Sequence, residues 1–146
     1  FMTNQPITKV FVYGTLKPGG RYHHVAQGAG AFTFEKAHLE NFIIYDLVPE
    51  GYPAIIPGKG KVHGYVFAYK DIDKALMMLD KLEAVHDSPP EYTREQVIAK
   101  PMNETVWVYV YAREERLQTA RRVESGEWLE ALPDDTRLLN RIQSEQ

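Results

Sequence analysis

The sequence predicts an α+β protein in which short β-strands close into a small barrel covered by helices or loops. Two observations favour this fold. Five short segments are rich in β-branched and aromatic residues and are separated by Gly, Pro, Asn and Asp. One amphipathic helical segment stands among them. A chain of 146 residues suits one domain. We interpret Met2 as the initiator, after Phe1, so the expected domain spans residues 2–146.

The strand segments follow one another with turn residues between them. The last one alternates valine with Trp or Tyr, so both of its faces are apolar. A strand covered on both sides indicates a barrel with an outer cover. The expected strands are Lys9–Leu16, His38–Leu47, Val62–Lys70, Tyr92–Lys100 and Glu104–Ala112.

Helices are expected at two places. The segment Asp71–Val85 repeats apolar residues on one face at about 100° per residue. A weaker helical pattern covers Ser125–Leu132 and Asp134–Gln143, with a break at Pro133. We expect this second segment to pack through its apolar side chains, which are Trp128, Leu129 and Leu132.

Glu83 occupies an unusual place in the first helical segment. It falls within the apolar arc that includes Leu76 and Leu79, whereas Asp80 is expected at the solvated rim. A carboxylate in that position should be protonated, hydrogen-bonded or facing a cavity. Two structural alternatives stay open: a last turn that tilts into solvent, and an ion pair with a nearby arginine.

The stretch VFVYGTLKPGG, residues 10–20, places a glycine just inside the end of an apolar strand. Gly14 would expose backbone N–H groups that can bind a carboxylate or an oxyanion. The alternative is a β-bulge or barrel corner, which needs glycine for steric reasons alone. The stretch lacks the spacing of a phosphate loop or of a dinucleotide-binding fingerprint.

Two tyrosines are candidates for the same site. Pro89 and Pro90 enforce an extended return that could lay Tyr92 beside the end of the helix. Tyr52, in the sequence GYP, could cover a pocket or serve as a structural aromatic residue. Tyr109 is expected either at the mouth of the barrel or, more simply, as filler beneath its cover.

Composition excludes several functional classes. The net charge is −3 with interspersed signs, which disfavours nucleic acid as a partner. The absence of cysteine excludes disulfides and thiolate chemistry, and the five histidines show no metal-ligand spacing, so no metal site is expected. No signal peptide or membrane-length apolar run occurs, and we therefore expect no membrane partner and a cytoplasmic location.

The order and spacing of four motifs resemble the gamma-glutamylcyclotransferase-like family, also called the AIG2-like family. The motifs are VYGTL, GYPAI, LDKLE and EYTR, and the resemblance covers roughly residues 9–112. The form VFVYGTLKPG looks closest to the gamma-glutamylamine cyclotransferase branch. Many relatives carry Gly directly after the glutamate of the third motif, whereas this chain carries Ala84.

The resemblance implies a small mixed β-barrel with flanking helices, and a site. Tyr13, Gly14, Thr15 and Leu16 would form the loop that holds the alpha-carboxylate and amine of a gamma-glutamyl group. Glu83 would be the catalytic acid–base. A loop amide or the Tyr92 hydroxyl would steady the developing oxyanion.

The implied activity is release of 5-oxoproline and a free amine from a small gamma-glutamyl amine or peptide, by a transferase or amine-releasing lyase. No cofactor is needed because the substrate carries its own nucleophile. The protein is expected as a monomer or homodimer. The alternatives are a non-catalytic small-molecule binding module of the same fold and a structural barrel used for protein interaction.

Overall fold

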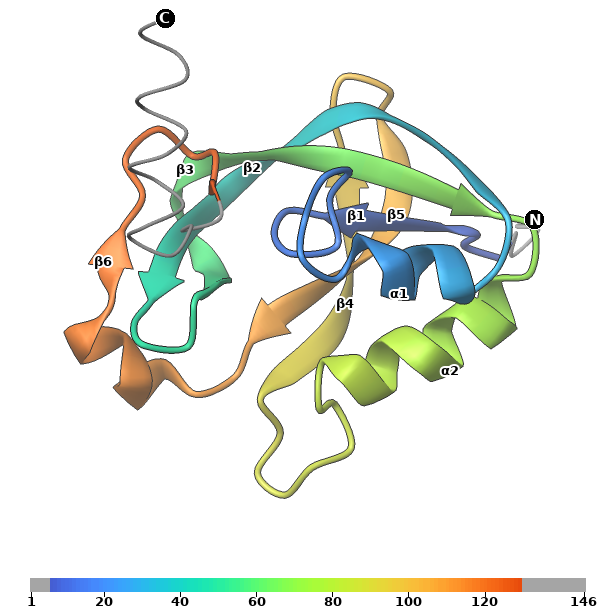
Figure 1. Cartoon of the computed structure of the whole chain (residues 1–146). Helices are drawn as coiled ribbons and strands as arrows, with labels where there is room; N and C mark the ends of the chain where they lie inside the picture. Colours follow the sequence, from blue (N-terminus) through green and yellow to red (C-terminus); the bar gives the residue numbers. More distant parts are fainter. Residues whose placement is uncertain (1–5, 130–146) are drawn as a thin grey trace, which may run out of the picture.

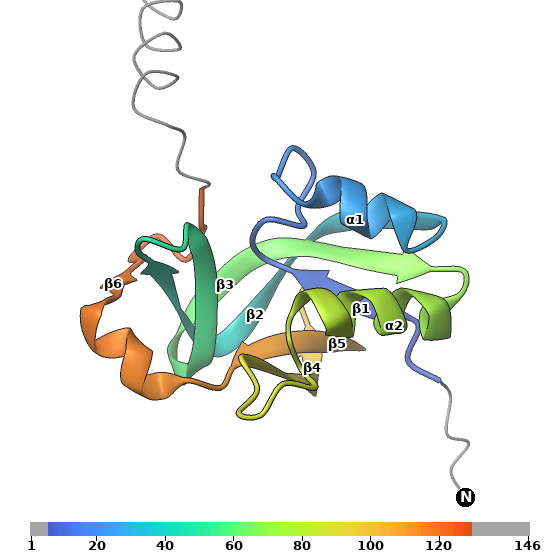
Figure 2. The same ribbon diagram turned by 60° about the horizontal axis from the view of Figure 1, so that its bottom comes forward.

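The fold is built on one curled sheet of mixed direction. The computed structural model describes residues 6–129, and within them six strands pair in the order β4-β5-β1-β3-β2-β6. Strands β1 and β5 are parallel and the other neighbours are antiparallel. Figures 1 and 2 show the sheet bending round into a half-barrel with short helices beside it. The predicted α+β class, with a mixed barrel-like sheet and flanking helices, is confirmed. The strands are β1 (Lys9–Val12), β2 (Phe32–Leu47), β3 (Tyr52–Tyr69), β4 (Tyr92–Ala99), β5 (Glu104–Tyr111) and β6 (Arg121–Arg122).

Strands β2 and β3 form a hairpin that is longer than the sequence predicts. Pairing continues from Leu47↔Tyr52 to Phe32↔Tyr69, with one register shift between Glu40 and Phe42. Asn41 lies at this shift with φ of 65°. Prolines and glycines between residues 53 and 60 resemble strand breakers locally, but the ladder to β2 carries the strand through them. The predicted strands His38–Leu47 and Val62–Lys70 are therefore parts of longer ones.

A short backbone bridge brings the far end of β4 back to β2. The His38 N–H donates to the Lys100 carbonyl and the Lys100 N–H donates to the His38 carbonyl, both at 2.8 Å. These bonds connect segments on opposite sides of β1 and β5 in the sheet order. The bridge therefore links two segments that the sheet order keeps apart.

Helix α2 (Ile72–Leu82) is shorter than the predicted Asp71–Val85. The Asp71 side chain caps its first turn by accepting a hydrogen bond from the Lys74 N–H at 3.2 Å. At the other end Glu83 is the C-cap residue, and Ala84 takes φ of 53°, which ends the helix. The helix therefore ends at Leu82, and the last three residues of the predicted segment, 83–85, lie outside it.

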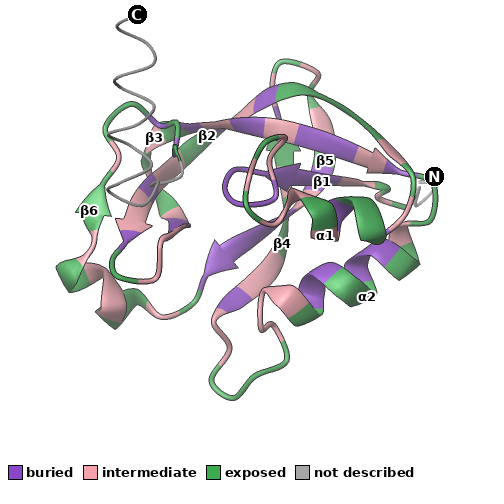
Figure 3. Ribbon diagram, viewed as in Figure 1, coloured by how far each residue is buried: buried purple, intermediate pink, exposed green. Residues whose placement is uncertain are grey.

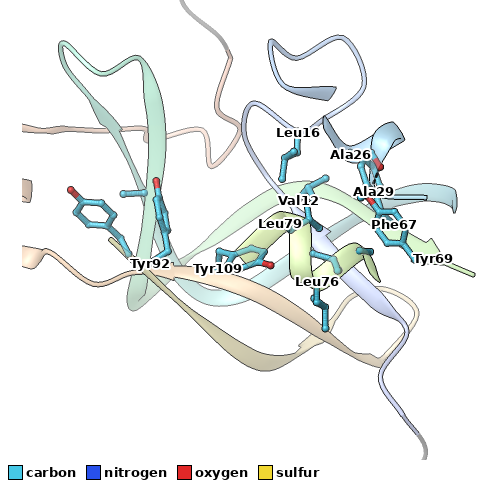
Figure 4. Packing of buried hydrophobic residues seen from close by; sticks show 14 of the residues in the cluster. Val12, Leu16, Ala26, Ala29, Phe67, Tyr69, Leu76, Leu79, Tyr92 and Tyr109 are labelled. Atoms are coloured by element: carbon cyan, nitrogen blue, oxygen red, sulfur yellow. Dashed lines mark hydrogen bonds between the residues drawn. The ribbon is translucent and has the colours of Figure 1, made fainter. Parts of the chain in front are cut away.

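Helix α1 (His23–Gly28) is not predicted by the sequence, because six residues are too few to establish a period. It packs with α2 over one hydrophobic cluster, and Figure 4 shows side chains of both helices around Val12 and Phe67. Figure 3 shows α2 with buried residues on one side and exposed residues on the other. β1 supplies Val10 and Val12 to this cluster, and its other face supplies Phe11 to a second one.

The predicted helix from Ser125 is wrong for residues 125–129, which are not helical. Trp128 is buried as predicted, and its indole N–H donates to Asp46 Oδ1 at 2.9 Å. Leu129 is 76% exposed and does not pack. Leu132 and the segment Asp134–Gln143 lie outside the described residues. A 3₁₀ helix, Glu114–Thr119, precedes β6.

Between residues 6 and 129, no helix combines the length and the apolar character needed to cross a lipid bilayer.

Candidate active site

A pocket of about 220 Å³ opens where four segments meet. They are the loop after β1, the start of β3, the end of α2 and the start of β4 (Figure 1). The pocket brings together every site residue that the sequence predicts, although they are spread over 80 positions of the chain. These residues are Tyr13, Gly14, Thr15, Leu16, Tyr52, Glu83 and Tyr92.

The loop after β1 offers backbone donors to the pocket. β1 ends at Val12, not at the predicted Leu16, because the chain turns at once: the Lys17 N–H donates to the Gly14 carbonyl at 3.0 Å. The Thr15 carbonyl accepts from the Tyr22 N–H at 2.9 Å, and the Leu16 carbonyl accepts from His23 Nδ1 at 2.8 Å.

The three consecutive N–H groups of Gly14, Thr15 and Leu16 have no acceptor among the described residues. Thr15 and Leu16 are 9% and 5% exposed, and buried N–H groups without partners are rare in proteins. Successive amides of this kind form a concave donor surface for anions. The loop is therefore chemically suited to bind a carboxylate or an oxyanion.

Gly14 itself is required for a second reason. A Cβ atom built on it would lie 2.5 Å from Pro53 Cγ and 2.7 Å from Pro53 Cδ. Pro53 belongs to the GYPAI motif at the start of β3, so two of the sequence motifs touch each other here. Glycine is thus needed at this position for a steric reason as well, because the Pro53 ring leaves no room for a side chain.

Glu83 faces the same pocket from the end of α2. It is half-buried and lies on the pocket wall. No cationic side chain pairs with it within residues 6–129, so the arginine ion-pair alternative is wrong for this part of the chain. Burial, and then the charge of Glu91, raise the pKa of the Glu83 carboxyl from 4.5 to about 8.

Four tyrosines form the wall around Glu83, and each of their hydroxyls already has an acceptor elsewhere. Tyr13 donates to the Tyr109 carbonyl at 2.5 Å, and Tyr109 donates to Asp80 Oδ1 at 2.7 Å. Tyr92 donates to the Pro53 carbonyl at 2.6 Å, and Tyr52 donates to a Glu91 carboxylate oxygen. Burial raises the pKa of both Tyr13 and Tyr92, which keeps these phenols neutral.

The Tyr109 bond corrects the prediction for Asp80. Asp80 is only 5% exposed, not a solvated rim residue. Besides the bond from Tyr109, it forms an ion pair with Arg94 Nε at 3.0 Å. Arg94 lies two residues after Tyr92, so this pair fixes the end of α2 against β4 and thereby supports the pocket wall.

Comparison with known proteins identifies the family to which this chain belongs. The family model described as "Gamma-glutamyl cyclotransferase, AIG2-like" matches residues 10–130. The chain belongs to this family. The Escherichia coli K12 protein named "Gamma-glutamylcyclotransferase family protein YtfP" is 36% identical over 125 residues, which cover 84% of this chain and 96% of the relative. A Drosophila melanogaster protein named "Putative gamma-glutamylcyclotransferase CG2811" is 32% identical over 111 residues, covering 70% of this chain and 68% of the relative.

Solved structures agree on the fold. An AIG2-like protein from mouse matches with a TM-score of 0.66 at 23% identity, covering 90% of this chain and 99% of the mouse chain. The solution structure of ytfP from Escherichia coli matches with a TM-score of 0.57 at 27% identity, covering 83% of this chain and 96% of the other. The curled mixed sheet is thus the gamma-glutamyl cyclotransferase fold.

Ala84 departs from the Gly that the resemblance predicts for many family members, and the structure shows what this position demands. Its φ of 53° lies in the left-handed region that glycine adopts without strain. The chain keeps the turn nevertheless: the Ala84 N–H donates to the Lys81 carbonyl and its carbonyl accepts from the Glu91 N–H, both at 3.2 Å. The turn therefore survives the substitution and returns the chain to the pocket at Glu91.

Three charged residues of the pocket are not predicted by the sequence. Glu50 pairs with Arg116, Glu91 accepts from Tyr52, and Arg21 donates to the Gly51 carbonyl at 2.9 Å. Glu91 opens the EYTR motif and Glu50 precedes the GYPAI motif. Their positions next to these motifs could have indicated from the sequence that they line the pocket. Within the described part of the chain, no group of His, Asp or Glu side chains is arranged to hold a metal ion.

Proposed function

We propose that this protein is a gamma-glutamyl cyclotransferase that converts a gamma-glutamyl amine or peptide into 5-oxoproline and a free amine. The observation that carries the proposal is one pocket that holds Glu83 together with the amides of residues 14–16. Within residues 6–129 this carboxylate has no cationic partner and these amides have no acceptor. Anion-binding amides and a proton-transferring carboxylate are the two functions that this reaction needs. Membership of the family supports the assignment.

The substrate supplies its own nucleophile. Its alpha-nitrogen attacks the gamma-carbonyl carbon, a new C–N bond closes the five-membered lactam, and the original amide C–N bond breaks to release the amine. The intramolecular attack needs the substrate held in a folded-back conformation. The amides of Gly14, Thr15 and Leu16 would fix the alpha-carboxylate, and so place the alpha-nitrogen on the side of Glu83.

Protons move from one nitrogen to the other during this reaction. The alpha-ammonium must lose a proton to become nucleophilic and a second one after attack, while the departing nitrogen gains both. Glu83 would accept each proton and return it to the leaving amine. A carboxyl pKa of about 8 suits this exchange near neutral pH, because acid and base forms are both populated there.

Two oxyanion donors were considered from the sequence, a loop amide and the Tyr92 hydroxyl, and the hydrogen bonds of the pocket favour the amide. The Tyr92 hydroxyl is engaged with the Pro53 carbonyl, so an amide of the loop is the better candidate. Tyr92 and Tyr52 would instead line the substrate pocket with their rings. Atoms and charge balance in this scheme without a cofactor, and the partner it implies is a small molecule.

The direct test is incubation of the wild-type protein with a panel of gamma-glutamyl amines and gamma-glutamyl dipeptides, with 5-oxoproline measured by mass spectrometry. Release of 5-oxoproline together with an equal amount of amine supports the proposal and identifies the substrate branch. Saturable binding of a panel member without any 5-oxoproline would overturn catalysis in favour of a binding module. Hydrolysis to free glutamate would also overturn the cyclisation.

A further inference from the structure

Glu91 is a second carboxylate in the pocket of Glu83, and the fold holds it there at two points. Its N–H donates to the Ala84 carbonyl at 3.2 Å, which closes the loop that leaves α2. Its side chain accepts a hydrogen bond from the Tyr52 hydroxyl. Glu91 is thus fixed both to the residue after Glu83 and to the first residue of β3.

The two carboxylates have different environments. The Glu91 carboxylate accepts a hydrogen bond from the Tyr52 hydroxyl. Glu83 has neither a side-chain donor nor a cationic partner within residues 6–129. Because Glu83 lacks such partners and Glu91 lies in the same pocket, repulsion between the two carboxyl groups favours the protonated form of Glu83.

Other groups face Glu83 without taking this role. Tyr13, Tyr92 and Tyr109 have neutral phenols whose hydroxyls are bonded elsewhere. Glu50 also lines the pocket, but its charge is offset by the ion pair with Arg116. Arg21 lines the pocket as well, where it donates to the Gly51 carbonyl and lies over the Tyr22 ring.

We propose that Glu91, anchored by the Tyr52 hydroxyl, is a positioning residue that keeps Glu83 in its proton-exchanging state by holding a fixed negative charge beside it. The catalytic consequence rests on the proposed function of Glu83, whereas the electrostatic relationship does not. Repulsion from Glu91 contributes to the raised pKa of Glu83, second to burial. Tyr52 gains a role through Glu91 that is additional to lining the pocket.

The electrostatic relationship is tested without any substrate by ¹³C NMR titration of glutamate carboxyl carbons, with the Glu83 and Glu91 signals assigned by their loss in Glu83→Gln and Glu91→Gln. In Glu91→Gln we expect the Glu83 midpoint to fall by about one pH unit. Glu91→Asp retains the charge and should retain most of the elevation. Glu50→Gln is the matched control and should leave the Glu83 midpoint in place, because the Glu83 pKa is raised by burial and Glu91 and not by Glu50.

Tyr52→Phe tests the anchor. It removes the hydrogen bond that holds the Glu91 side chain in place, so the repulsion on Glu83 should weaken and the Glu83 midpoint should fall in the direction of Glu91→Gln. The proposal is overturned if the Glu83 midpoint is the same in Glu91→Gln and wild type, or if Glu50→Gln lowers it as much. A Glu83 midpoint that Tyr52→Phe leaves unchanged would overturn the role of Tyr52.

The catalytic consequence has a separate readout. The rising limb of the kcat/KM profile against pH should move to lower pH in Glu91→Gln, by the same amount as the Glu83 midpoint. If Glu91→Gln lowers kcat/KM by the same factor at every pH and the rising limb stays at the wild-type pH, Glu91 has only a structural or binding role. If the wild type releases no 5-oxoproline, the proposed function fails, and the NMR titration still decides whether Glu91 governs Glu83.

Discussion

The ring of Pro53 packs against the backbone of Gly14, so closely that a Cβ atom on Gly14 would lie 2.5 Å from Pro53 Cγ. This contact joins the loop after β1 to the first residues of β3, and both segments line the pocket. The same proline presents its carbonyl to the Tyr92 hydroxyl at 2.6 Å. Pro53 is thus the point at which the loop after β1, the β3 strand and the β4 strand meet.

Gly14→Ala should therefore lower the free energy of unfolding by roughly 1–3 kcal/mol, the usual range for an overpacked site. Gly28→Ala is a suitable control, because its Cβ would meet only Met78 Cε at 4.0 Å. Chemical denaturation measures both variants. Replacing Pro53 by Ala in the Gly14→Ala background should recover part of the loss, since it removes the clashing ring atoms. A Gly14→Ala variant as stable as wild type would contradict the steric account.

Ala84→Gly should stabilise the protein. Ala84 holds φ of 53° at the end of α2, and a left-handed conformation costs an L-residue roughly 1–2 kcal/mol. Because glycine is also more flexible in the unfolded chain, we expect a net gain of about 0.5–1 kcal/mol in the free energy of unfolding. Ala75→Gly, in the middle of α2, should be destabilising. If Ala84→Gly lowers the free energy of unfolding as much as Ala75→Gly does, the turn does not strain Ala84.

Sequence patterns predicted the parts of this fold that are dictated locally. The alternation of valine with aromatic residues located β5, and the apolar period located α2, because each pattern reflects burial of one segment. The Gly14 loop and Glu83 were recognisable because a glycine inside a strand end and a carboxylate on an apolar face both conflict with their local context.

The remainder depends on contacts between distant segments. Pro57 resembles a strand breaker on its own, but in the structure it pairs with Phe42 within the long β2–β3 ladder. Asp80 looked solvated because its two partners, Tyr109 and Arg94, come from β5 and β4. Glu91 reaches Glu83 only through the turn at Ala84, which no local period describes.

The raised pKa of Glu83 makes a prediction for stability. The unfolded chain titrates this carboxyl near its ordinary pKa of 4.5, whereas the folded protein retains the proton up to about pH 8. Between these values the folded state binds more protons, so the contribution of Glu83 to the free energy of unfolding falls as pH rises.

Glu83→Gln removes this titration. The variant should match wild type near pH 4 and should exceed it by roughly 1–3 kcal/mol above pH 8, after allowance for the partial exposure of the side chain. Melting temperatures of both proteins from pH 4 to pH 9 measure the difference. A variant that is less stable than wild type at every pH would indicate that Glu83 serves as a structural acceptor.

Turnover by Glu83→Gln tests the central claim most directly. Glutamine preserves the size of Glu83 but cannot exchange a proton, so release of 5-oxoproline from the best gamma-glutamyl substrate should fall by roughly 10² or more, while substrate still binds and the protein remains folded. Glu95→Gln, an exposed change on β4, should retain wild-type turnover. If Glu83→Gln instead releases 5-oxoproline at nearly the wild-type rate, Glu83 does not carry the proton and the proposed mechanism is contradicted.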